Sequence, residues 1–135
     1  MRSPRLSLVL MMLVGCAPKN IARASCQSHP LTTADEWSCT VTGEVVGQIS
    51  SIEFDTESRN HVAQVIIALR VTKGTLRIGY HDLTGEKNLV VTPSEPGNLV
   101  MQTRMHRERR SFTVFFEPVN GAVEGLAGTV KYSTP

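Results

Sequence analysis

From residue 38 onward the chain alternates apolar and polar side chains with the two-residue period that is typical of β-strands. In the first such segment, 38–49, one parity holds Cys39, Val41, Val45 and Ile49. The longest segment is 61–72, and one of its faces is wholly apolar: Ala63, Val65, Ile67, Leu69 and Val71. The same period predicts strands at 75–81, 88–92, 99–105, 111–117 and 123–132, whereas 50–54 either extends the first strand or starts another.

Turn residues separate these segments. Lys73-Gly74 predicts a hairpin that pairs the long strand with the next one, where Leu76, Ile78 and Tyr80 would face inward. The charged stretch 107–110 predicts the tip of a second hairpin, and 118–121 turns the chain into the last strand.

Seven or eight short strands with turns every 8–12 residues or so indicate an all-β fold, either an antiparallel β-sandwich (jelly-roll or immunoglobulin-like) or a barrel. The strand series resembles the jelly-roll accessory domains of secreted bacterial proteins. This resemblance concerns the fold alone and implies no particular function.

The first 15 residues follow a different pattern. Arg2 and Arg5 precede an almost wholly apolar run, 6–14. The run is too short for a transmembrane helix, which needs about 20 residues, but it fits the apolar core of a secretory signal, about 7–15 residues long. The start of the chain therefore predicts export across a membrane.

The apolar run ends in Leu13-Val14-Gly15-Cys16, which resembles the lipobox of bacterial lipoprotein precursors at all four positions. The resemblance covers residues 1–16 and implies cleavage after Gly15 and a diacylglycerol thioether on Cys16. Two acyl chains hold a protein stably on a membrane, whereas one chain binds only marginally. Ala17, in a place where aspartate commonly retains lipoproteins at the inner membrane, implies the periplasmic side of the outer membrane in a Gram-negative host.

These features divide the chain into a signal peptide (1–15), a lipidated tether (16–25) and a single all-β domain (26–135). From Cys16 to Cys26 the extended tether spans at most about 35 Å, so we expect the domain to stay close to the bilayer. The expected location is the cell envelope, and the membrane is an expected partner through the lipid on Cys16.

The cysteine count agrees with export. The chain has three cysteines, and lipidation of Cys16 leaves Cys26 and Cys39. In an oxidising compartment such a pair normally forms a disulfide, which here closes a loop worth about 3 kcal/mol in the chain-entropy model. The alternative of two free thiols or half a metal site lacks a nearby CxxC or histidine pair.

Charge argues against nucleic acid as a partner. The full chain has 14 basic and 12 acidic residues, and loss of Arg2 and Arg5 with the signal peptide balances the two classes. A neutral domain lacks the overall field that nucleic-acid binding needs. One dense basic patch remains, formed by Arg104, Arg107, Arg109 and Arg110 and opposed by Glu108 alone. It predicts either a solvated loop or a site for an anionic lipid or glycan.

Signatures of catalysis and metal binding are absent. The chain has no GxSxG, P-loop, HExxH or CxxC motif, and its four histidines show no ligand spacing, so we expect no metal or cofactor. One alternative is a small hydrolase or other enzyme whose site lies near Tyr80, His81 and Asp82. The simpler interpretation is that these residues end a strand and enter a turn.

The strands carry more apolar residues than one core needs. Several occupy the parity that a sandwich exposes: Val46, Val62, Ile66, Ala68, Val90, Val100 and Phe115. Either other parts of the chain cover them, or they form a surface for a partner such as an envelope protein. The sequence thus predicts a non-enzymatic binding or assembly module of the envelope, with its ligand open.

Overall fold

The computed structural model describes residues 20–28, 35–56 and 61–134. It confirms the all-β prediction, because the described residues form eight antiparallel strands in a sheet that does not close into a barrel. The signal peptide, Cys16 and residues 17–19 lie outside the described residues. The described ranges contain no helix that is long and apolar enough to cross a membrane. The strands are β1 (Arg23–Ser28), β2 (Asp35–Val46), β3 (Ser50–Asp55), β4 (Val62–Arg70), β5 (Lys73–Asp82), β6 (Gly85–Val91), β7 (Gly97–Arg104) and β8 (Ser111–Thr134).

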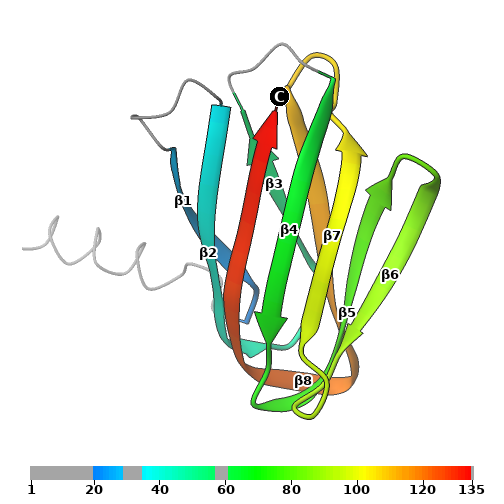
Figure 1. Ribbon diagram of the computed structural model, residues 1–135. Coiled ribbons are helices and arrows are strands. Elements are labelled where there is room, and N and C mark those ends of the chain that lie inside the picture. The colour runs from blue at the N-terminus through cyan, green and yellow to red at the C-terminus, as the bar shows by residue number, and fades with distance from the viewer. Residues whose placement is uncertain (1–19, 29–34, 57–60, 135) are drawn as a thin grey trace, which may run out of the picture.

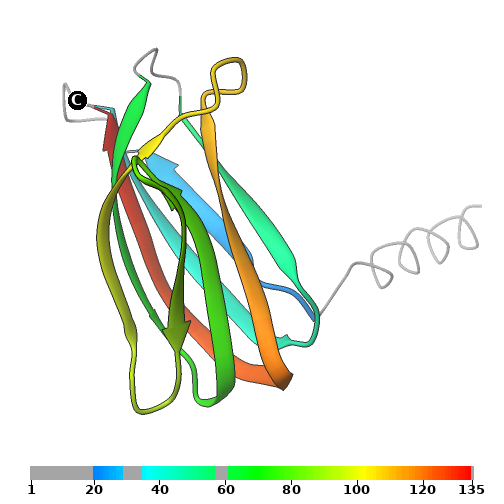
Figure 2. The ribbon, with the colours of Figure 1, turned by 90° about the vertical axis from the view of Figure 1, so that its right-hand side faces the viewer.

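The sheet is folded into two layers, as the two ribbon views show (Figures 1 and 2). The first layer contains β1, β2, the second half of β8, β4 and β7, in that order. The second layer contains β3, the first half of β8, β5 and β6. This arrangement is a β-sandwich in which β8 belongs to both layers.

β8 passes from one layer to the other without losing its hydrogen-bonded neighbours. Its residues 111–119 pair with β3 and β5, and its residues from 123 onward pair with β2 and β4. The bend lies at Asn120 and Gly121, whose φ angles of 59° and 125° turn the strand (Figure 1, orange to red). The predicted turn at 118–121 is therefore a bend within one strand.

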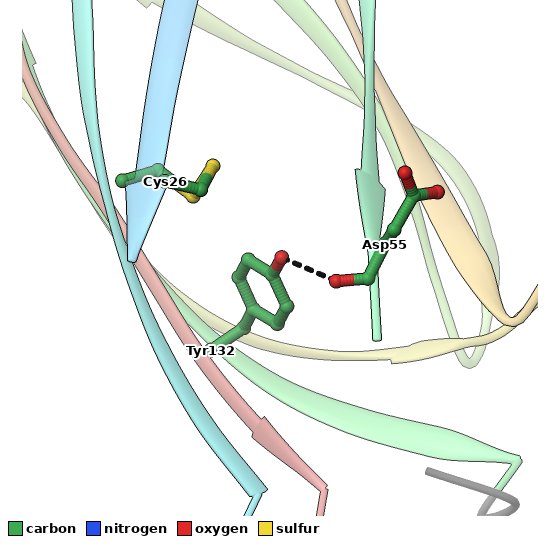
Figure 3. The surroundings of a disulfide bond; sticks show 4 residues. Cys26, Asp55 and Tyr132 are labelled. Atoms are coloured by element: carbon green, nitrogen blue, oxygen red, sulfur yellow. Dashed lines mark hydrogen bonds between the residues drawn. A yellow bond between two sulfur atoms is a disulfide. The ribbon is translucent and has the colours of Figure 1, made fainter. Parts of the chain in front are cut away.

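An aromatic cluster links the layers inside the sandwich. Tyr132 projects from the first layer, and its ring lies 5.0 Å from that of Phe112 and 5.9 Å from that of Phe54, both in the second layer. Its hydroxyl donates a hydrogen bond of 2.6 Å to the carbonyl oxygen of Asp55, close to the disulfide (Figure 3). Buried tyrosines normally find such a partner for the hydroxyl, and this one joins β8 to β3 across the core.

The inward faces that the alternation predicts are confirmed in β4 and β5. All five residues of the predicted apolar face of 61–72 are buried, as are Leu76, Ile78 and Tyr80. The parity predicted for the end of β2 was wrong, because Val46 is buried in place of Val45 and Ile49 is exposed. The buried Val46 fills the space beside Gly43, because a Cβ at residue 43 would lie 2.7 Å from Val46 Cγ2.

Both predicted hairpins were wrong. β4 and β5 do not pair with each other, and at Gly74 (φ 93°) the chain instead crosses from the first layer to the second. β7 pairs with β4, whereas the first half of β8 pairs with β3 and β5, so the 105–110 loop also connects the layers. Turn residues mark where a strand ends, but they do not state which strand is its partner.

The structure contains a strand, β1, that overlaps the predicted tether (16–25). β1 begins at Arg23 and pairs with β2 over six residue pairs. The fold begins still earlier, because Ala22 is buried and its N–H donates to Ser50 Oγ at 3.3 Å. Cys26 and Cys39 face each other across β1 and β2 and form the predicted disulfide.

Close contact between β8 and β4 depends on Gly128. Its φ is 153°, and a Cβ there would overlap the carbonyl oxygen of Ala68 and lie 2.8 Å from Leu69 Cα. We expect Gly128→Ala to lower the free energy of unfolding by about 3 kcal/mol or more, since backbone must move in the centre of the first layer. Denaturant titration measures this loss.

Gly121→Ala is the matched control. Gly121 also has a left-handed φ, but nothing lies within 4 Å of a Cβ built there, so the substitution adds backbone strain of about 1–3 kcal/mol without a clash. Equal losses for the two variants would show that contact with β4 is not what requires glycine at 128.

Candidate functional site

A depression of about 670 Å³ lies at one end of the sandwich, between the β5–β6 turn and the 105–110 loop. Its lining includes six polar or charged side chains: His81, Asp82, Arg104, His106, Arg109 and Ser111. We call this depression the end cleft. It brings two arginines of the predicted basic patch, Arg104 and Arg109, to the same place as His81 and Asp82, whereas Arg107 and Arg110 are not part of its lining.

The 105–110 loop is held by its own hydrogen bonds. His106 N–H donates to the Ser111 carbonyl at 2.7 Å, and Arg110 N–H donates to the His106 carbonyl at 2.8 Å. Arg109 N–H donates to His106 Nδ1 at 3.2 Å, and Arg110 adopts a φ of 52°. Met105 is buried beneath these residues, so the loop is a compact turn that presents its arginines outward.

The loop is also tied to the strand ends around it. Thr56 N–H donates to the Arg110 carbonyl at 3.0 Å, and Met105 N–H donates to the His61 carbonyl at 2.6 Å. The Thr103 hydroxyl donates to the His81 carbonyl at 2.6 Å and so connects β7 with β5 across the layers. The walls of the end cleft are thus fixed by bonds from four different segments.

The arginines differ in how far their charge is compensated. Arg109 Nε lies 3.5 Å from Glu53 Oε2, and both side chains are well exposed. In the part of the chain that the structure describes, Arg104 and Arg107 have no carboxylate within ion-pair distance. These two cations are therefore the ones whose charge is most available to an anionic ligand.

Ser111 adds a second polar feature to the end cleft. The residue is 1% exposed, and its hydroxyl has no hydrogen-bond partner among the described residues. A buried hydroxyl without a partner costs about 1–3 kcal/mol. Ser111 lines the cleft, but its hydroxyl oxygen is itself buried and is not open to a ligand there.

Tyr80, His81 and Asp82 do not form a converging catalytic group. Tyr80 is buried, whereas His81 is exposed on the opposite face of β5. Burial, helped by the negative charge of Asp82, raises the pKa of the Tyr80 phenol, so the phenol stays protonated. The structure thus gives these residues the roles of a strand end and a turn.

Asp82 caps the β5–β6 turn. Its Oδ1 accepts hydrogen bonds from the Thr84 hydroxyl (2.6 Å), Thr84 N–H (2.7 Å) and Gly85 N–H (3.1 Å). The Thr84 hydroxyl, followed by its backbone N–H, lowers the pKa of this carboxyl. A carboxylate stabilised in this way is a weak base and is occupied by the turn.

The exposed apolar residues lie on both outer faces. Ile66 and Val100 are cross-strand neighbours on the first layer and are 50% and 77% exposed. Val90 and Phe115 are exposed on the second layer, so these four are not covered, whereas Val46 is buried. Trp37, the single tryptophan, stacks on Tyr132 at a centroid distance of 6.2 Å and is partly buried.

Within the described ranges no three histidine, cysteine, aspartate or glutamate side chains gather as a metal site would require. The sequence identified the four arginines but missed their neighbours Glu53 and Ser111. Glu53 lies beside Arg109 only because β3 pairs with β8, and no local pattern marks that contact. Ser111 directly follows the arginines in the sequence, but nothing in the sequence shows that its hydroxyl is buried.

The cap at Asp82 yields a pH-dependent prediction. A carboxyl whose pKa is lowered by folding stabilises the protein above its ordinary pKa, and this contribution disappears as the pH falls through the folded pKa. We therefore expect Asp82→Ala to lower the melting temperature at pH 7, and the difference from the unmodified protein to shrink below about pH 4. Glu86→Ala, on the same hairpin, is the control and should change little. A difference that is constant down to pH 2 would contradict the role of the charged cap.

Comparisons with known proteins identify no family for this chain. No family model and no curated protein matches the chain. Solved structures that resemble it include a pilus protein of Bacillus endospore appendages (16% identity, TM-score 0.43, 88% of this chain and 95% of that one). The PRD1 vertex protein P5 is another (10% identity, TM-score 0.45, 87% of this chain and 99% of that one). The CBM22-1 xylan-binding domain of Paenibacillus barcinonensis Xyn10C is a third (12% identity, TM-score 0.43, 84% of this chain and 92% of that one). These likenesses are too distant to indicate what the chain binds.

Proposed function

We propose that this chain is a lipid-anchored, non-enzymatic binding module of the bacterial envelope, and that its end cleft holds an anionic envelope component. The observation that carries the proposal is the end cleft itself, which Arg104 and Arg109 both line and where Arg104 has no carboxylate within ion-pair distance among the described residues. Arginine is well suited to phosphate and carboxylate groups because its planar guanidinium offers several donors. Of the carboxylates nearby, Glu53 is paired with Arg109, whereas Asp82 keeps its negative charge and is held in its turn by hydrogen bonds.

The position of the tether bears on where this ligand lies. The Asn20 carbonyl accepts a hydrogen bond from Gly47 N–H, and Ala22 is bonded to Ser50 at the start of β3. The basic loop is bonded to Thr56, just beyond the other end of β3. The two points are separated by the length of a six-residue strand, about 20 Å.

A lipid on Cys16 would hold the Asn20 end close to the membrane, because the four intervening peptide steps span at most about 14 Å. The end cleft then points away from that membrane (Figure 2 shows the start of β1 and the 105–110 loop at opposite ends). This geometry favours an anionic component on the far side of the domain over the headgroups of the anchoring bilayer. Direct docking of the loop onto that bilayer, which the sequence suggested, is the less favoured arrangement.

The anchor is tested by Cys16→Ser. We expect this variant to leave the membrane fraction or to accumulate with its signal peptide uncleaved, because serine lacks the sulfur atom to which the diacylglycerol is attached. Fractionation together with labelled palmitate measures both effects. Unchanged membrane association of Cys16→Ser, with no palmitate in the unmodified protein, would contradict the lipoprotein assignment.

The ligand is tested by charge reversal. We expect the unmodified protein to bind an anionic polymer, such as lipopolysaccharide or polyphosphate, at low salt and to release it as salt rises. Arg104→Glu with Arg109→Glu, which reverses the two arginines that line the cleft, should weaken binding by about 2 kcal/mol or more, at about 1 kcal/mol for each basic residue near an anionic surface. Equilibrium binding at two salt concentrations measures the change.

Arg70→Glu with Lys131→Glu changes the net charge equally on the outer face of the first layer. This control should retain most of the binding. If both double variants weaken binding to the same extent, the interaction depends on overall charge and the end cleft is not its site.

A further inference from the structure

A second depression lies beside the end cleft, on the outer face of the second layer. Its volume is about 240 Å³, and its lining includes Arg77, Gly79, Asn88, Phe115 and Glu117. Phe115 lines this depression and the end cleft as well, so the two are continuous across its ring. We call the second depression the Phe115 depression.

The Phe115 ring lies over a glycine. Phe115 and Gly79 are cross-strand partners, and a Cβ at residue 79 would lie 3.4 Å from Phe115 Cβ and 3.9 Å from its Cδ2. Because residue 79 has no side chain, the Phe115 ring lies across the sheet above the glycine and stays 40% exposed. Aromatic residues do cover glycines in sheets for stability alone, so the ring by itself identifies no ligand.

The neighbours of the ring are what point to a ligand. Along its row of the sheet Phe115 has Ser51 on one side, and Asn88 follows beyond Gly79 on the other. In the next row Arg77 Nη1 donates to Glu117 Oε1 at 2.7 Å. One apolar ring is thus surrounded by side chains that both donate and accept hydrogen bonds.

This part of the surface differs from the end cleft in charge. The pairing of Arg77 with Glu117 compensates both charges, and Glu86 adds an acidic group to the depression. A phosphate or carboxylate gains little here, whereas an uncharged group with hydroxyls on its edge and C–H bonds on its face suits the site. Small-ligand sites generally combine apolar or aromatic walls with a few placed polar groups in this way.

We propose that a sugar ring stacks on Phe115 and hydrogen-bonds to Asn88 and the Arg77–Glu117 pair, so that the anionic ligand of the end cleft is a glycan. This inference rests on the proposed function and narrows it from an anionic component in general to an acidic polysaccharide. Ser111 and Phe115 are four residues apart on β8, about 13 Å. The arginines of the end cleft and the Phe115 ring therefore contact different units of one oligomeric ligand.

The test compares two polyanions, one with sugar rings and one without. Binding of hyaluronate, in which uncharged N-acetylglucosamine units alternate with glucuronate units, and of polyphosphate to the full exported protein, purified in detergent, is measured for the unmodified chain, Phe115→Ala and Phe115→Trp. Loss of the ring should weaken hyaluronate binding about fivefold to tenfold, as truncation of an aromatic contact residue commonly does. Polyphosphate binding should be unchanged, and tryptophan should preserve the affinity for hyaluronate.

Val100→Ala serves as the control, because it removes an exposed apolar side chain from the opposite face. It should alter neither affinity, and melting curves establish that each variant is folded. If Phe115→Ala leaves hyaluronate binding unchanged, or weakens the binding of both polymers equally, the sugar-stacking inference is wrong. Binding of polyphosphate alone overturns the inference and leaves the proposed function standing, whereas binding of neither polymer overturns both.

Discussion

The hydrogen bonding of β8 in both layers is the constraint on which the rest of the structure depends. A strand that changes layers must bend without leaving its carbonyl and amide groups unpaired, because buried backbone groups are costly without partners. β8 meets this requirement by bending at Asn120 and Gly121, where the chain passes the end of the sandwich. Each of its halves is then central in its own layer, so β2, β3, β4 and β5 all take their register from one segment.

The sequence predicts what is local in this fold and misses what is not. The alternation of apolar and polar residues predicted which faces of β4 and β5 are buried, because the period of a strand follows from its own residues. It did not give strand partners, and Gly74 illustrates why: a left-handed glycine serves a hairpin and a layer crossing equally well. β1 escaped detection because its residues are mostly exposed and are held by pairing with β2 and by the disulfide.

The candidate site has the same division between local and long-range information. The arginines of the 105–110 loop stand out in the sequence by their density alone. Their setting depends on distant segments, because Glu53 reaches Arg109 from β3 and the β5–β6 turn forms the facing wall. In the sequence, Phe115 is one of several apolar residues on the parity that a sandwich exposes. Its distinguishing neighbours, Gly79 and Asn88, come from β5 and β6 and lie beside it only when those strands pair with each other and with β8.

The pairing of β1 with β2 also has a mechanical consequence. Any force applied to the chain before residue 20 enters the fold at the Asn20 end and runs along β1. Its six pairs with β2 lie across the direction of pull and are therefore loaded together in shear. Among these pairs, the disulfide between Cys26 and Cys39 joins the strand covalently to β2, which is itself paired with β8. A sustained force on the N-terminal side would thus be resisted by the first layer as a whole.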